Sequence, residues 1–106
     1  MTLSPIFEPP YYAVIFTSLR HEGDHGYGAM AEEMEKLGSA QPGYLGIDSA
    51  RSEVGITVSY WQNLADIHAW KAQLEHQQAQ RLGKEQWYAS YTVRVAKVEY
   101  NYEFGR

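Results

Sequence analysis

The feature that most constrains the fold is the passage from a strand into a helix within residues 54–76. Apolar residues alternate with smaller or polar ones over residues 54–60, and this period of two predicts a β-strand. Asn63 then offers a side-chain oxygen to the free backbone N–H groups of a helix, and Asp66 places a carboxylate near the positive end of the helix dipole. The sequence therefore predicts a helix that begins at about Leu64, directly after a strand.

The N-terminal third predicts an arm, a strand and a helix. Pro9-Pro10 ends an extended arm over residues 1–10, and the β-branched and aromatic run of Tyr11–Arg20 predicts a buried strand. In the next segment apolar residues recur at spacings of three and four, namely at Tyr27, Met30, Met34 and Leu37. We expect Asp24 to cap this helix and Gly38 to end it, since glycine most easily adopts the left-handed conformation.

The remaining segments predict a hairpin and a long last strand. Gln41-Pro-Gly43 turns the chain into a strand over Tyr44–Ala50, and the polar link Arg51–Glu53 joins it to the strand at residues 54–60. After the second helix, Leu82–Trp87 is typical of a turn with a short helical piece. The segment from Trp87 to Phe104 predicts one very long strand, which we expect to outreach its own sheet and to serve a neighbouring subunit.

Composition restricts the class of protein. The chain has 106 residues with 44% hydrophobic content, enough for a single domain over residues 11–106 with one core. It contains no cysteine, so disulfides and thiolate nucleophiles are excluded. The net charge of −4 and the scattered basic residues disfavour nucleic acid and anionic membranes as partners. Because no segment approaches the ~20 apolar residues of a membrane span and the first ten residues lack a signal-peptide pattern, we expect a cytoplasmic protein.

The element order β-α-β-β-α-β predicts a ferredoxin-like, or split βαβ, α+β fold: a four-stranded antiparallel sheet with two helices on one face. One side of the strand at residues 54–60 carries Val54, Ile56, Val58 and Tyr60, and the other carries Gly55, Thr57, Ser59 and Trp61. We expect the apolar side to face the helices and the mixed side to be open. An open face with bare aromatic residues predicts a two-fold dimer packed sheet against sheet.

Several short motifs occur along the chain in a recognisable order. They are Gln41-Pro-Gly-Tyr-Leu-Gly46, Ser59-Tyr-Trp61, Trp70, Glu75-His76 and Trp87-Tyr-Ala-Ser-Tyr91. Together they resemble the antibiotic-biosynthesis monooxygenase domain, a branch of the dimeric α+β barrel proteins. The resemblance implies that fold and a dimer. It does not single out one activity, because members of this family carry out cofactor-free oxygenation of polyketide phenols or oxidative haem breakdown, or have no established reaction. The fold alone does not determine which of these applies.

The haem-degrading branch of this family uses an Asn on the first strand, a Trp on the second helix and an axial His about ten residues further on. Trp70 matches the Trp, but Tyr11–Arg20 contains no Asn and the residue ten positions after Trp70 is Gln80. His76 lies about 120° around the helix from Trp70, at 100° per residue. Haem breakdown is therefore the minor interpretation.

Cofactor-free oxygenation needs an apolar pocket for a planar phenol, a group that helps to form the electron-rich phenolate, and room for O₂. We expect this pocket between the sheet and the helices, with no metal and no flavin as cofactor. The candidate catalytic residues are His76, Trp70 and Tyr91. The candidate substrate-binding residues are Phe16, Tyr60, Trp61, Arg51 and Arg94.

Some of these candidates also have a purely structural interpretation. Trp70 shares a core spacing with Ile67 and Leu74, which is typical of packing. His76 lies beside a stripe of alanines suited to close packing, so a hydrogen-bonded structural histidine is the alternative. Arg94 on a long strand suits a cross-strand ion pair.

Two functions of different class stay open. One is a small oxygenase acting on an aromatic or polyketide-like phenol, and the other is a non-catalytic dimeric protein, ligand-binding or stress-associated, that uses the same pocket. His21 and His25 are a metal-site alternative, but Gly23 indicates a loop, in which the i, i+4 spacing does not align two ligands. We therefore expect a homodimer that has no metal site and binds a small aromatic ligand.

Overall fold

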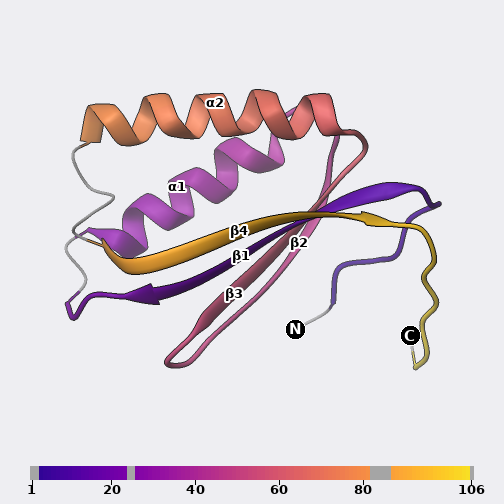
Figure 1. Cartoon of the computed structure of the whole chain (residues 1–106), viewed down its shortest axis with the longest axis horizontal. Coiled ribbons are helices and arrows are strands. Elements are labelled where there is room, and N and C mark those ends of the chain that lie inside the picture. Colours follow the sequence, from indigo (N-terminus) through magenta and orange to yellow (C-terminus); the bar gives the residue numbers. More distant parts are fainter. Residues whose placement is uncertain (1–2, 24–25, 82–86, 106) are drawn as a thin grey trace.

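The computed structural model describes residues 3–23, 26–81 and 87–105, with side chains for 3–23, 26–74 and 87–105. Its elements are β1 (Tyr11–Arg20), α1 (Tyr27–Ser39), β2 (Tyr44–Arg51), β3 (Gly55–Trp61), α2 (Leu64–Arg81) and β4 (Tyr88–Val98). The strands form one antiparallel sheet in the order β2-β3-β1-β4. Both helices lie on the same side of this sheet (Figure 1). The predicted ferredoxin-like α+β fold is confirmed.

The last strand is shorter than predicted. β4 ends at Val98, so the expected strand from Trp87 to Phe104 is wrong over its final third. Val98 pairs with Tyr11, the first residue of β1, and the chain beyond it has no neighbouring strand within the described part of the monomer. The aromatic side chains of this tail, Tyr100, Tyr102 and Phe104, are exposed. The turn expected at Leu82–Trp87 falls on residues 82–86, which lie outside the described residues.

The start of α2 confirms the predicted cap. The backbone N–H of Asp66 donates to Asn63 Oδ1 at 2.9 Å, so Asn63 satisfies one of the free donors of the first turn. The turn before β2 depends on Gly43, whose φ of 80° is left-handed. A Cβ on Gly43 would lie 2.1 Å from Asp66 Oδ2, so this glycine is required by both conformation and space.

The two ends of α1 differ from the prediction. Asp24 lies outside the described residues, and the helix begins after Gly26, which has a φ of 83° and makes no side-chain cap. The helix continues to Ser39, so Gly38 does not end it. Gly38 is instead buried, and a Cβ there would lie 3.2 Å from the ring of Trp70. Its absent side chain lets α1 and α2 pack closely.

The two faces of the sheet are the reverse of the prediction. Trp61 is 1% exposed and stacks on Trp70 of α2, with 6.5 Å between ring centroids. The mixed side of β3, which includes Trp61, therefore faces the helices. Its apolar side is the open face, where Ile56 is 46% exposed. The prediction is wrong because alternation shows which residues share a face but not which face the helices cover.

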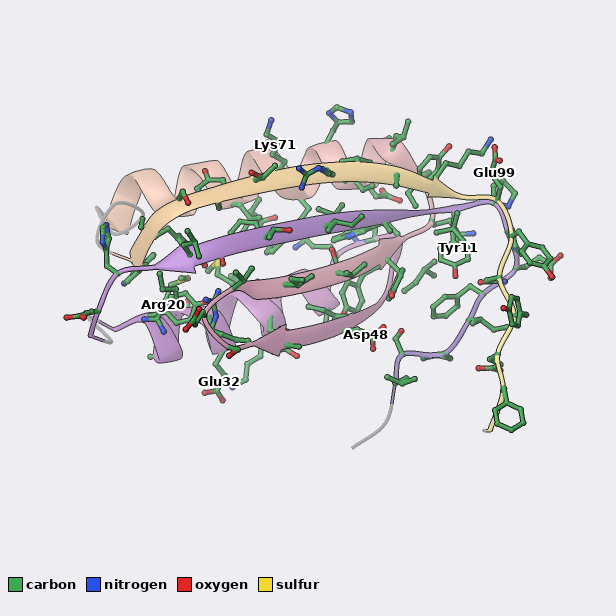
Figure 2. The ribbon with its side chains drawn as sticks, turned by 60° about the horizontal axis from the view of Figure 1, so that its bottom comes forward. Tyr11, Arg20, Glu32, Asp48, Lys71 and Glu99 are labelled. Carbon is green, nitrogen blue, oxygen red and sulfur yellow. The ribbon has the colours of Figure 1, made fainter. Side chains whose placement is uncertain are left out.

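The N-terminal arm packs on one end of the open face. The backbone N–H of Ser4 donates to Asp48 Oδ1 at 2.8 Å, and Phe7 meets Tyr11 edge to face at 5.6 Å. Tyr60 donates from its hydroxyl to Asp48 Oδ2 at 2.9 Å. Figure 2 shows this face in front of the helices, with Tyr11 and Asp48 near the arm. The arm thus covers the Tyr11 end of the open face, whereas Leu19 and Ile56 at the other end are exposed.

Candidate functional site

The helix-facing side of the sheet is ordered in cross-strand rows, because paired residues in neighbouring strands point to the same face. The first row contains Arg51, Gly55, Ser18 and Tyr91, taken in the order β2, β3, β1 and β4. The second row contains Ser49, Thr57, Phe16 and Val93, and the third contains Ile47, Ser59, Val14 and Val95. Side chains are therefore small or polar along β3, and mostly aromatic or branched along β1 and β4.

Five of these side chains form what we call the β1–β4 floor: Val14, Phe16, Tyr91, Val93 and Val95. Phe16 stacks on Tyr91 at 5.1 Å between ring centroids. The helices approach the sheet mainly over the other two strands, α1 at β2 and α2 at β3. As a result Tyr91, Val93 and Val95 remain 37%, 49% and 49% exposed, although they point to the helix side. The floor is an apolar surface that the helix layer leaves half open.

Arg51 lies across the first row at one end of this floor. A Cβ on Gly55 would lie 2.0 Å from Arg51 Nη2, so the guanidinium passes directly over the bare backbone of β3. It continues to β1, where Arg51 Nη2 donates to Ser18 Oγ. Ser18 is 2% exposed and pairs with Tyr91 in the same row. The guanidinium therefore lies about one strand spacing, roughly 5 Å, from the floor.

A second arginine and two tyrosines lie at the same end. Arg20 sits over the ring of Tyr27, with Cζ 3.7 Å from the ring centroid, in a cation–π contact. Tyr88 donates from its hydroxyl to the Tyr27 hydroxyl at 3.3 Å, and its ring meets Phe16 at 5.4 Å. Burial, followed by the hydrogen bond and the nearness of Tyr27, raises the pKa of Tyr88 far above its ordinary value, and the charges of Arg51 and Arg20 offset only part of this. The Tyr88 phenol therefore stays neutral at ordinary pH.

The two candidate tryptophans form a packed pair under α2. Trp61 Nε1 donates to Ser59 Oγ at 2.9 Å, and its ring is held between Tyr44 and Trp70. Trp70 also lies against Gly38 of α1. These contacts join both helices to β3 and fix the separation between the helix layer and the sheet.

The structure brings some predicted site residues together and separates others. Phe16, Tyr91 and Arg51 lie on or beside the floor, and Trp61 and Trp70 lie on the same side of the sheet. Tyr60 is next to Trp61 in β3, so it points to the opposite side of the sheet, which is the open face. Arg94 pairs with Ile15, and Ile15 pairs with Val58 on the same open face. They do not lie with the other candidates.

His76 belongs to α2, but its side chain lies outside the described residues. The same holds for His25 of the rejected metal hypothesis. Among the described residues no group of three or more His, Cys, Asp or Glu side chains comes together as a metal site requires. A hollow of about 270 Å³ occurs on the exposed side of α1, lined by Glu32, Glu35, Lys36 and Ser39. It lies away from the floor.

Sequence reasoning missed Ser18, Arg20, Tyr27 and Tyr88 as members of this end of the floor. Strand register is the signal that could have found Ser18, since it places Ser18 beside Tyr91. Arg20 and Tyr88 pair across a register shift after Leu19, and such an irregularity has no clear local pattern.

The chain matches a family model and a known relative over most of its length. The family model described as "Antibiotic biosynthesis monooxygenase" matches residues 10–82. The uncharacterised protein YqjZ of Bacillus subtilis strain 168 is 52% identical over 99 residues, which cover 92% of this chain and 87% of the relative. No helix in the described part of the chain is long and apolar enough to cross a membrane.

Solved structures share the fold. A protein of Nitrosomonas europaea, provisionally assigned as an antibiotic biosynthesis monooxygenase, has a TM-score of 0.68 at 15% identity and covers 95% of this chain and 100% of its own. PA3566 of Pseudomonas aeruginosa has a TM-score of 0.59 at 18% identity and covers 89% and 97%. The family model matches most of the chain, and more than half of the aligned residues are identical in the Bacillus subtilis relative. The chain therefore belongs to the antibiotic biosynthesis monooxygenase family.

Proposed function

We propose that this chain is a homodimeric, cofactor-free monooxygenase that oxidises a small phenolic, polyketide-like aromatic compound on the β1–β4 floor. The observation that carries the proposal is the floor itself. It faces the helix layer, contains the stacked pair Phe16 and Tyr91, and leaves Val93 and Val95 about half exposed. A flat aromatic ring needs an apolar surface of this kind. Family membership supports the type of reaction.

The reaction is illustrated by a hydroxyanthrone. Removal of a proton makes the electron-rich anthrolate, which reacts with O₂ at the ring methylene carbon. One oxygen atom becomes the new quinone carbonyl, and the other leaves as water with the two methylene hydrogens. The protein must therefore bind the ring, take up a proton and exclude bulk water. The proposed catalytic residues are His76, Trp70 and Tyr91, and the proposed substrate-binding residues are Phe16, Trp61 and Arg51.

The test is O₂ uptake by the purified protein with hydroxyanthrones and quinols under air, together with the absorbance of the quinone product. His76→Ala removes the proposed base, and Val93→Asp places a carboxylate on the floor. We expect each to lower turnover at least tenfold, a barrier change of about 1.4 kcal/mol.

Arg94→Gln is the matched control, because Arg94 lies on the opposite face of the same strand as Val93. It should leave turnover unchanged. If the wild type binds these phenols but consumes no O₂ with any of them, the protein is a non-catalytic binding dimer and the oxygenase proposal is wrong. A haem absorption band followed by ring breakdown would instead indicate the haem-degrading branch.

The open face supports the homodimer. Leu19 and Ile56 on this face are 44% and 46% exposed, and Ile15 and Val58 lie beside them. A contiguous apolar surface of this kind is unusual on a monomer. A second copy that packs its own open face against it by two-fold symmetry covers both surfaces at once.

A further inference from the structure

Two guanidinium groups lie at one end of the β1–β4 floor. Arg51 comes from the end of β2 and Arg20 from the end of β1, so two separate strand ends deliver positive charge to the same place. Both lie near enough to the Tyr88 hydroxyl for their charges to act on it.

Neither guanidinium is neutralised within the described part of the chain. The partners of Arg20 are the carbonyl oxygen of Gly23 and the ring of Tyr27, and the partner of Arg51 is the hydroxyl of Ser18. All are uncharged. Arg20 Nε is buried and has no hydrogen-bond partner.

The surroundings hold both groups in place. Gly55 leaves the space through which the Arg51 side chain passes, and buried Ser18 accepts its hydrogen bond. The Tyr27 ring contacts the Arg20 guanidinium. Side chains fixed in this way lose little further freedom when they bind a ligand, which favours affinity.

We propose that Arg51 and Arg20 form an anion-binding end of the floor, so that its ligand is an aromatic acid. The ring lies on Phe16 and Tyr91, and the carboxylate meets the guanidinium groups. A guanidinium presents several N–H donors in a plane and matches a carboxylate in geometry as well as in charge. This inference rests on the proposed function of the floor as the ligand site and defines its substrate class as phenolic carboxylic acids.

The test compares two ligands that differ in charge. The neutral fluorescent probe N-phenyl-1-naphthylamine reports occupancy of the floor, and either 2-naphthoate or the uncharged 2-naphthalenemethanol displaces it. We expect 2-naphthoate to displace the probe from the wild type at a concentration about tenfold lower than the alcohol. Arg51→Gln and Arg20→Gln should each remove most of this preference while the affinity for the neutral probe is kept.

Arg94→Gln removes the same charge from the opposite face and should keep the preference. Equal displacement by the two naphthalenes in the wild type, or an unchanged preference in both floor variants, overturns the anion site but leaves the floor as a site for neutral aromatics. Failure of every naphthalene to bind overturns the floor and the anion site together. Circular dichroism checks folding, and Arg51→Lys, which keeps the charge but not the planar group, replaces Arg51→Gln if that variant does not fold.

Discussion

Replacement of Gly55 by alanine tests how the Arg51 guanidinium is held. The new Cβ would lie 2.0 Å from Arg51 Nη2 and 2.2 Å from its Cζ, far inside contact distance, so the guanidinium has to move. Because Arg51 is an exposed side chain, its displaced far end can swing into solvent. We therefore expect the fold to survive and the hydrogen bond to Ser18 to be lost.

The expected change in stability is small. Loss of the partner of buried Ser18 costs about 1.5 kcal/mol. Alanine in a strand regains about 0.5 kcal/mol relative to glycine, because the unfolded chain loses less freedom. The free energy of unfolding should fall by about 1 kcal/mol in a urea titration. The preference for 2-naphthoate over 2-naphthalenemethanol should fall as it does in Arg51→Gln.

Gly43→Ala is the contrasting variant, since a Cβ there would lie 2.1 Å from Asp66 Oδ2 and also 2.9 Å from Asp66 Cβ. That Cβ is next to the helix backbone and cannot swing away, and the φ of 80° adds left-handed strain of about 1–2 kcal/mol. We expect Gly43→Ala to cost about 3 kcal/mol in total. If Gly55→Ala destabilises the protein as much as Gly43→Ala, or keeps the naphthoate preference, the Arg51 guanidinium does not act as described.

Two further predictions concern the open face. If the open face is the dimer interface, Ile56→Asp should give a monomer in sedimentation equilibrium at micromolar concentration, because it places a charge on an exposed apolar position of that face. Val93→Asp, with similar exposure on the opposite face, should leave the dimer intact. The same oligomeric state for both variants would contradict the proposed interface. Burial, followed by the hydrogen bond to Asp48, raises the pKa of Tyr60 to about 12, above its ordinary value of 10.0. Because the pKa is raised in the folded state, the stabilisation from Tyr60 is complete below pH 10 and is lost as the pH rises through 12. The free energy of unfolding, measured in urea at pH 9 and at pH 11.5, should therefore fall less for Tyr60→Phe than for the wild type. The expected difference is about 1 kcal/mol or less after allowance for solvent screening. An identical loss in both proteins would show that Tyr60 does not contribute.

Local signals account for the part of the fold that could be predicted from the sequence. The Asn63 cap needs only residues three positions apart, and β1 is defined by its own dense run of strand formers. Gly38 shows the limit of such signals. Its sequence context is that of a helix end, yet its role is to admit the ring of Trp70, a residue on another helix. A local pattern carries no record of this contact.

The candidate site depends even more on distant pairs. Arg51 and Ser18 are 33 positions apart, and Tyr88 and Tyr27 are 61 positions apart. Their meeting follows from strand register and from the irregularity after Leu19, neither of which the pattern of apolar residues specifies. For this reason candidate residue types could be named from the sequence, whereas the face of the sheet on which each one lies could not.

The reversal of the two faces has a functional consequence. The helices approach the sheet mainly over β2 and β3, on the side of β3 that carries Trp61, and they leave the neighbouring floor half open. The apolar side is thereby free for a second copy of the chain. Two consecutive residues of β4 therefore test different surfaces. Val93 lies on the floor, where we propose that the ligand binds, and Arg94 lies on the open face, where we propose that a second copy packs. If a substitution at Val93 changes ligand binding and one at Arg94 does not, the ligand site lies on the helix side of the sheet.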